Sequence, residues 1–153
     1  MQSVFYTNQS LILPKEGKYG ELYLGNYLAA EDAKFHKMKG VTSILTVAKS
    51  PFLTIPDTIS SQKVIDADDD PSFILSKYFK ECFDYIHKER SKGRNVLVHC
   101  MAGVSRSATI VIGYIMTYYG KDMKTAFNMV LEKRRCIGPN YGFRSQLEVY
   151  EKQ

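Results

Sequence analysis

Residues 95–107 read NVLVHCMAGVSRS and contain the clearest structural pattern in the chain. Its first part, NVLVH, is a short apolar run that predicts a buried strand. A loop containing Gly103 follows, and from about residue 105 to residue 119 the chain is apolar nearly all round. Such a helix belongs in the middle of a core. The sequence therefore predicts a strand, a tight loop and a buried helix in direct succession.

The segments on either side alternate between strand and helix patterns. Strands are predicted at residues 21–27, 41–47 and 62–67, and helices at residues 29–39, from 72 to about 93, after Asp122 and after Asn140. Gly40 is expected to end the first of these helices, and Asp70 with Pro71 to begin the second. This alternation predicts an α/β fold with a central sheet flanked by helices on both faces. Ligands of such folds bind beyond the carboxyl ends of the strands, where the loop after Val98 lies.

Length and composition describe an ordinary globular chain. With 153 residues, 44% hydrophobic and 24% charged, it can form one domain around a hydrophobic core, and we expect a single domain over residues 1–153. The net charge of +5 favours anionic partners such as phosphoproteins, nucleic acid or acidic lipid headgroups. No run of five or more like charges is present, and no basic stretch is interleaved with aromatics, so nucleic acid is not an expected partner.

Cysteine spacing indicates the redox environment. Cys82, Cys100 and Cys136 stand at unrelated spacings that match neither a disulfide framework nor a paired zinc pattern. A reducing compartment fits this pattern, so we expect the cytoplasm, the nucleus or both. His36 and His87 are expected at the surface, and no spacing of histidines or carboxylates indicates a metal site.

Neither a membrane span nor a lipid anchor is expected. The amino terminus lacks the pattern of a signal peptide, and Gln2 stands where myristoylation requires a glycine. The most apolar stretch, residues 108–119, is shorter than the roughly 20 residues that a membrane span needs.

The loop after the buried strand contains the parts that phosphate chemistry needs. Backbone N–H groups of a loop wrapped around an anion point inward, Gly103 permits a conformation closed to other residues, and the following helix adds positive potential at its N-terminus. Arg106, planar and charged, can bind two phosphate oxygens. Cys100 is the candidate nucleophile, and its thiolate would be stabilised by Arg106, by N–H groups and by the hydroxyl of Ser105 or Ser107.

At these residues the sequence resembles the cysteine-dependent protein phosphatases, and more narrowly their small dual-specificity branch. The shared pattern is His, Cys, two residues, Gly, two residues, Arg and then Ser or Thr, and HCMAGVSRS matches it. The segments YFKECFDYI, GYIM and IGPNYGFRSQL also look like that branch, so the resemblance covers roughly residues 22–151. It implies the twisted, mixed sheet of the protein tyrosine phosphatases and a motif-bearing core at about residues 20–151.

The resemblance further implies hydrolysis of phosphate esters in proteins without metal or cofactor. Cys100 would attack phosphorus and form a cysteinyl-phosphate, which water then hydrolyses. Ser107 would assist departure of the sulfur, and His99 would tune the cysteine and order the loop. Phosphate would be bound by the loop itself: Met101, Ala102, Gly103, Val104, Ser105 and Arg106. Because the chain lacks the aromatic recognition segment of strict tyrosine phosphatases, we expect a shallow pocket that admits phosphotyrosine, phosphothreonine and phosphoserine.

The general acid is expected among the aspartates before the long helix. The candidates are Asp66, Asp68, Asp69 and Asp70. Aligning Tyr78 and Phe79 with the aromatic pair of related phosphatases places Asp69 at the position of the acid, with Asp68 as the next choice. Asp70 precedes a proline and is better explained as a turn or capping residue.

Two further residues have a functional and a structural interpretation of equal weight. Arg135 matches an arginine that binds a second phosphate or an acidic substrate residue in some relatives, but it could equally be an exposed arginine at a helix end. Asn140 could brace the active-site loop or simply cap a helix.

Cys136 could trap Cys100 as a disulfide, although the sequence gives no specific sign of this.

Two other functions remain open at this point. One is a catalytically weak module that binds phosphopeptides, and the other is a phosphatase acting on lipid or RNA phosphate. The apolar loop residues Met101, Ala102 and Val104 favour a phosphoprotein over a highly charged lipid headgroup. We therefore expect phosphorylated proteins as substrates and a monomeric chain.

Overall fold

The computed structural model describes residues 7–49 and 52–153, so the expectation about Gln2 and the amino terminus lies outside the described residues. One sheet has the strand order β1-β2-β5-β3-β4. Its strands are β1 (Gln9–Leu13), β2 (Leu22–Gly25), β3 (Val41–Val47), β4 (Ser61–Ile65) and β5 (Asn95–His99). Strand β1 runs antiparallel to β2, whereas the other neighbours are parallel. The sheet is therefore mixed, as predicted.

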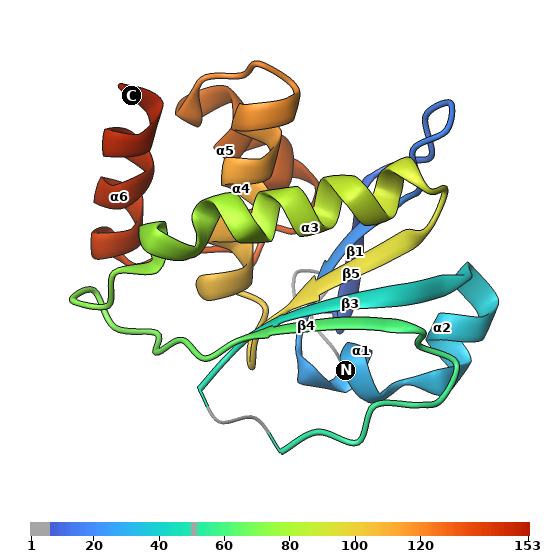
Figure 1. The fold of residues 1–153 in the computed structure, drawn as a ribbon. Coiled ribbons are helices and arrows are strands. Elements are labelled where there is room, and N and C mark those ends of the chain that lie inside the picture. Colours follow the sequence, from blue (N-terminus) through green and yellow to red (C-terminus); the bar gives the residue numbers. More distant parts are fainter. Residues whose placement is uncertain (1–6, 50–51) are drawn as a thin grey trace.

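Helices cover both faces of this sheet (Figure 1). One face carries α3 (Phe79–Ser91), α4 (Arg106–Tyr118), α5 (Met123–Lys133) and α6 (Tyr141–Glu151), and the other carries α1 (Tyr27–Glu31) and α2 (Ala33–Lys39). Alternate strand residues supply the two cores: Val96 and Val98 face the larger one, and Leu97 faces the smaller one. The α/β class with helices on both faces is confirmed.

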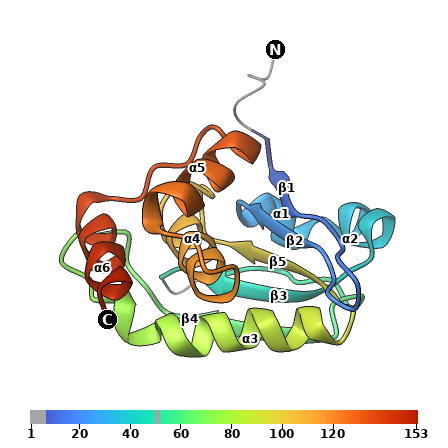
Figure 2. The same ribbon diagram turned by 90° about the horizontal axis from the view of Figure 1, so that it is seen from above.

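Helix α4 occupies the centre of the larger core. Figure 2 shows it between α3, α5 and α6, and it contacts all three. Every residue from Ser107 to Met116 is buried, which confirms the prediction of a central helix. Burial on all sides fixes the direction of α4, and its first turn therefore has a defined position at the end of β5.

Two boundaries near the amino terminus differ from the prediction. The segment 29–39 is two helices, because Asp32 adopts an extended conformation and its side chain accepts a hydrogen bond from the N–H of Phe35. The strand predicted at 21–27 ends at Gly25, because Asn26 caps α1 by accepting from the N–H of Ala29. In both places a short polar side chain competes for backbone N–H groups and starts a helix.

The helix predicted from residue 72 begins later than expected. Asp70 does not cap it, since its side chain accepts hydrogen bonds from the N–H and hydroxyl of Ser72. A 3-10 turn, Leu75–Tyr78, leads into α3 instead. Residues 66–74, here called the aspartate segment, thus form a loop in front of the helix.

Three further predictions need correction. Strand β1 was not predicted; its sequence, QSLIL, alternates only weakly because it lies at the edge of the sheet. Strand β4 ends at Ile65 rather than at Ala67, whose N–H donates to Ala48 beyond the ladder. His36 is buried rather than at the surface, because its ring packs beside Phe35 and its Nε2 lies 2.8 Å from the carbonyl of Ala29 in α1.

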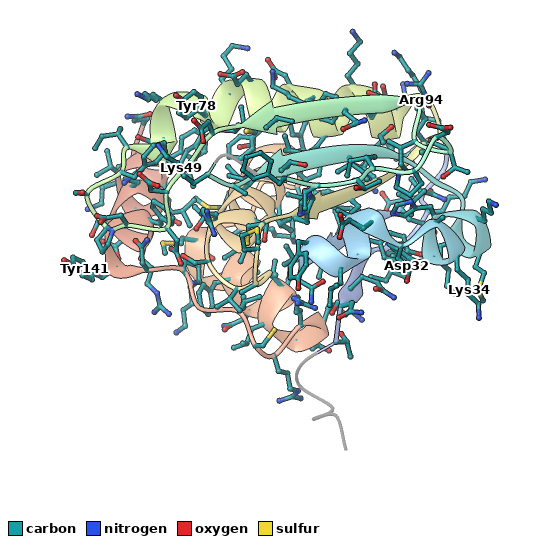
Figure 3. The ribbon with its side chains drawn as sticks, turned by 90° about the horizontal axis from the view of Figure 1, so that it is seen from below. Asp32, Lys34, Lys49, Tyr78, Arg94 and Tyr141 are labelled. Carbon is teal, nitrogen blue, oxygen red and sulfur yellow. The ribbon has the colours of Figure 1, made fainter. Side chains whose placement is uncertain are left out.

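The carboxyl ends of the parallel strands meet at one end of the molecule. Lys49, just after β3, lies at that end in Figure 3, whereas Arg94, just before β5, lies at the opposite end. Tyr141, the first residue of α6, projects outward on the side of Lys49. Within residues 7–49 and 52–153, no helix combines the length and apolarity that crossing a bilayer demands.

Candidate active site

Cys100 lies where β5 ends, at the start of a loop that closes on its sulfur. The N–H of Gly103 donates to Sγ at 3.2 Å, and the hydroxyl of Ser107 lies 3.0 Å from Sγ. Gly103 has φ of 69°, a left-handed conformation that a residue with a Cβ would adopt under strain. The side chain of Cys100 is thereby placed between the N–H of Gly103 and the first turn of α4, to which Ser107 belongs.

Hydrogen bonds from the chain between α5 and α6 hold the outer side of this loop. The N–H of Gly138 donates to the carbonyl of Val104 at 2.8 Å, and the N–H of Asn140 donates to the hydroxyl of Ser105 at 3.0 Å. The hydroxyl of Ser105 is thus engaged away from the sulfur. Of the two serines considered from the sequence, Ser107 is the one whose hydroxyl lies beside Cys100.

Arg106 begins α4 and connects the loop to the aspartate segment. Its Nη1 donates to the carbonyl of Ala67 at 2.9 Å. Its Nε is buried and has no hydrogen-bond partner among the described residues. This buried N–H is available to donate a hydrogen bond to an oxyanion, since leaving it unpaired is unfavourable.

His99 is fully buried behind the cysteine. Its Nδ1 lies 3.0 Å from the carbonyl of Cys100 and its Nε2 2.7 Å from the hydroxyl of Thr46. Since a carbonyl can only accept, Nδ1 carries the proton and Nε2 accepts from Thr46. Burial lowers the pKa of His99 to about 4, so the ring is neutral at neutral pH. The neutral ring is hydrogen-bonded at both nitrogens, and one of these bonds holds the carbonyl of Cys100.

The buried, neutral His99 should make the protein less stable in acid. The unfolded chain binds a proton at His99 near pH 6.5, whereas the folded state binds it only near pH 4. Stability is therefore lost as the pH falls through this window, by roughly 3 kcal/mol for this group. We expect urea unfolding of a His99→Gln variant to show a shallower pH dependence than the wild type between these values. Equal slopes would contradict the assignment.

The aspartates before α3 differ in their contacts. Asp69 accepts a hydrogen bond at Oδ1 from Nδ2 of Asn140 at 3.0 Å. The orientation of the Asn140 amide is settled, because its Oδ1 accepts from the N–H of Phe143. Asp70 is bonded by Ser72, and these bonds lower its pKa, which makes it a poor proton donor. Asp68 is half-buried and Asp66 is exposed.

Helix α6 holds the aspartate segment in place. Nε2 of Gln146 donates to the carbonyl of Phe73, and its Oε1 accepts from the N–H of Ser76. Gly142 permits the closest approach, since a Cβ there would lie 2.0 Å from the carbonyl oxygen of Pro71. The segment IGPNYGFRSQL thus has a physical role. It joins the aspartate segment to the loop of residues 101–106, the phosphate-loop candidate.

The structure separates the two neighbouring arginines at the end of α5. Arg135 is exposed and lines a hollow of about 470 Å³ beside β1, and no hydrogen bond described in the structure joins it to the Cys100 loop. Arg134 is 2% exposed, and its Nε donates to the carbonyl of Gly103 at 2.9 Å. Sequence reasoning missed Arg134. Its spacing of four residues from the buried Val130, itself four after the buried Ala126, could have identified it.

The chain matches a known family over most of its length. The model for "Dual specificity phosphatase, catalytic domain" covers residues 22–153. Mouse dual specificity protein phosphatase 15 is 40% identical over 84% of this chain. Human dual specificity protein phosphatase 22 is 42% identical over 86% of this chain. The matched regions make up 54% and 70% of those two proteins, so the chain spans only about half the length of the first of them.

Solved structures share the fold over nearly the whole chain. The crystal structure of DUSP15 has a TM-score of 0.85 at 36% identity and covers 95% of this chain and 88% of that one. The human tyrosine phosphatase-like serine/threonine/tyrosine-interacting protein has a TM-score of 0.85 at 33% identity and covers 94% of this chain and 95% of that one.

Proposed function

The chain belongs to the dual specificity phosphatase family, and we propose that it hydrolyses phosphotyrosine and phosphoserine or phosphothreonine in proteins. The observation that carries the proposal is the position of Cys100 Sγ, which lies within hydrogen-bond distance of Gly103 N–H and the Ser107 hydroxyl. Such surroundings stabilise a thiolate and leave the loop to bind a phosphoryl group.

In the first proposed step, the phosphate ester binds in the loop of residues 101–106, and Cys100 attacks phosphorus. An S–P bond forms while the bond between phosphorus and the leaving oxygen breaks. Arg106 donates to the equatorial oxygens, where charge accumulates. Asp69 gives its proton to the leaving oxygen, for which Oδ2 is suited because Oδ1 is held by Asn140. Arg135 would contact the substrate beyond the phosphate.

In the second proposed step, water attacks the phosphorus of the cysteinyl-phosphate. The ionised Asp69 takes a proton from this water, and the S–P bond breaks to release orthophosphate. Ser107 donates its hydroxyl hydrogen bond to the departing thiolate, from 3.0 Å. His99, neutral and hydrogen-bonded on both nitrogens, keeps the Cys100 carbonyl out of the site.

The proposal includes the setting of the reaction. Residues 1–153 would act as one catalytic domain, with the motif-bearing core at about 20–151. Its substrates would be phosphorylated proteins in the cytoplasm or nucleus. The chain would act as a monomer, would need no metal and would not bind nucleic acid. A positive net charge of +5 supports attraction of anionic substrates.

A second candidate is a module that binds phosphorylated peptides without turnover. It is favoured by the human structural neighbour, which is named as a tyrosine phosphatase-like interacting protein. The same fold can host both activities, so the fold does not choose between them. Cys100, Arg106 and Asp69 together favour hydrolysis, because binding alone needs neither a nucleophile nor an acid.

Phosphate release from matched peptides tests the proposal. With EDTA present, we expect the wild type to release orthophosphate from a phosphotyrosine peptide and from a phosphothreonine peptide of otherwise equal sequence. Release from phosphotyrosine alone would show a deep pocket and overturn dual specificity. Binding of both peptides without release would favour the module.

The acid assignment is tested by leaving groups. We expect Asp69→Asn to lower kcat about 100-fold for phenyl phosphate and much less for p-nitrophenyl phosphate, whose leaving oxygen needs no proton. Asp70→Asn, which alters a turn, is the control and should match the wild type. If Asp68→Asn shows the leaving-group dependence and Asp69→Asn does not, the acid is Asp68.

A further inference from the structure

Arg134 is a buried cation at the back of the phosphate-loop candidate. Only 2% of its surface is exposed, although it directly precedes the exposed Arg135. A charged side chain is rarely buried unless polar groups compensate it. Its partners therefore indicate its role.

The hydrogen bonds of Arg134 run in two directions. Nε donates to the carbonyl of Gly103 at 2.9 Å, in the loop beside Cys100. Nη1 donates to the carbonyl of Thr7 at 2.9 Å and to the hydroxyl of Ser10 at 3.1 Å, at the beginning of β1. The guanidinium of Arg134 thus joins the phosphate-loop candidate to strand β1.

The contact with Gly103 affects the face that the loop presents to phosphate. Gly103 is the residue whose N–H donates to Cys100 Sγ, and its φ is 69°. Because glycine has no Cβ, the peptide that follows it can rotate more freely than after other residues. If the Gly103 carbonyl turned inward, its negative end would oppose the anion. Arg134 holds this carbonyl outward, and a Cβ on Gly103 would lie 2.7 Å from Arg134 Nη2, so the two groups are closely packed.

We propose that Arg134 is a positioning residue that couples the amino-terminal strand to the shape of the phosphate loop. This inference rests on the proposed phosphatase function and extends it: changes at residues 7–10 alter oxyanion binding at Cys100 through Arg134. Lysine cannot replace it, because a single ammonium group cannot reproduce the fixed fork that bonds both Gly103 and Ser10.

The chain contains a matched control for the loss of a buried arginine. Arg90 is 1% exposed and bonds the carbonyl of Gly20 and the hydroxyls of Tyr114 and Tyr119. None of these groups belongs to the Cys100 loop. Arg90→Met should therefore lower the melting temperature without changing oxyanion affinity. Lys133→Met, which removes an exposed charge next to Arg134, controls for charge alone.

The experiment compares Arg134→Met, Arg134→Lys and Ser10→Ala with these two controls. Orthovanadate affinity is measured by titration calorimetry. The value of kcat/KM is measured with an aryl phosphate, and the melting temperature by scanning calorimetry. We expect Arg134→Met to weaken vanadate binding and kcat/KM by roughly 10- to 100-fold, with Arg134→Lys also impaired. Ser10→Ala removes one acceptor at the far end and should weaken both by about fivefold.

The outcomes separate this inference from the proposed function. Vanadate affinity that is equal in Arg134→Met and Arg90→Met, once both are folded, overturns the positioning role. If Arg134→Met does not fold, Arg134→Lys and Ser10→Ala decide, and wild-type vanadate affinity in both overturns it. A wild type that binds vanadate but releases no phosphate overturns the proposed function, while the vanadate affinities still decide the role of Arg134.

Discussion

Replacing Cys100 by serine is expected to lower kcat/KM for an aryl phosphate by at least about 10⁴-fold, in EDTA and near pH 6. A hydroxyl in the same position is a far weaker nucleophile than a thiolate, and loss of a nucleophile removes the covalent route altogether. Binding should survive, because the loop N–H groups and Arg106 remain. The measurement is initial-rate hydrolysis together with phosphopeptide affinity of the same variant.

Cys136→Ser provides the matched control, since Cys136 is half-buried and no described hydrogen bond joins it to the loop. It should retain wild-type kcat/KM. If Cys100→Ser keeps more than about one tenth of the activity, the nucleophile lies elsewhere and the cysteinyl-phosphate mechanism falls. If Cys136→Ser loses activity as well, the two thiols act together.

The second large effect is expected at Arg106. Arg106→Met should lower kcat/KM by about 10³-fold, because the transition-state oxygens lose charge-assisted donors in a buried setting. Arg106→Lys should still lose about 100-fold, since an ammonium group cannot bond two oxygens in one plane. Kinetics on an aryl phosphate and orthovanadate inhibition would both report the loss.

Arg94→Lys is the control for this substitution, since Arg94 lies at the opposite end of the sheet (Figure 3). Arg94 pairs with Glu89 and not with the Cys100 loop, so Arg94→Lys should leave vanadate inhibition at the wild-type level. Wild-type vanadate inhibition in Arg106→Lys would show that Arg106 only anchors the aspartate segment through Ala67, and that it does not bind phosphate.

Elements whose burial is uniform were the easiest to predict from the sequence. Strand β3 and strand β5 were predicted to the residue, and α4 to within one residue at each end, because their apolar runs leave no other interpretation. The predicted boundaries were wrong, or a strand was missed, where local hydrogen bonds or the edge of the sheet determine the structure. Asp32 splits a helix, Asp70 forms a turn, and β1 lies at the edge of the sheet, where it pairs with β2 on one side.

The candidate site divides in the same way. Cys100, Gly103, Arg106 and Ser107 are neighbours in the sequence, so their spacing alone indicates one loop. Thr46 meets His99 only because β3 and β5 pair in parallel with these residues in register. Partners brought together by register or by the buried face of a helix have no local signature, and a single sequence does not display them.

The attachment of the aspartate segment to α6 has a consequence for the timing of turnover. Asn140, Gly142 and Gln146 fix this segment at several points, so Asp69 is already beside the loop before any substrate arrives. Many enzymes gate their chemistry by closing a lid, and solvent viscosity then slows them. If Asp69 is the proton donor, as proposed, its loop is already attached to α6 and needs no such closure. The turnover rate should therefore depend on the reactivity of the phosphate ester and not on solvent viscosity. A rigid inhibitor shaped to this site would bind without a conformational change of the protein.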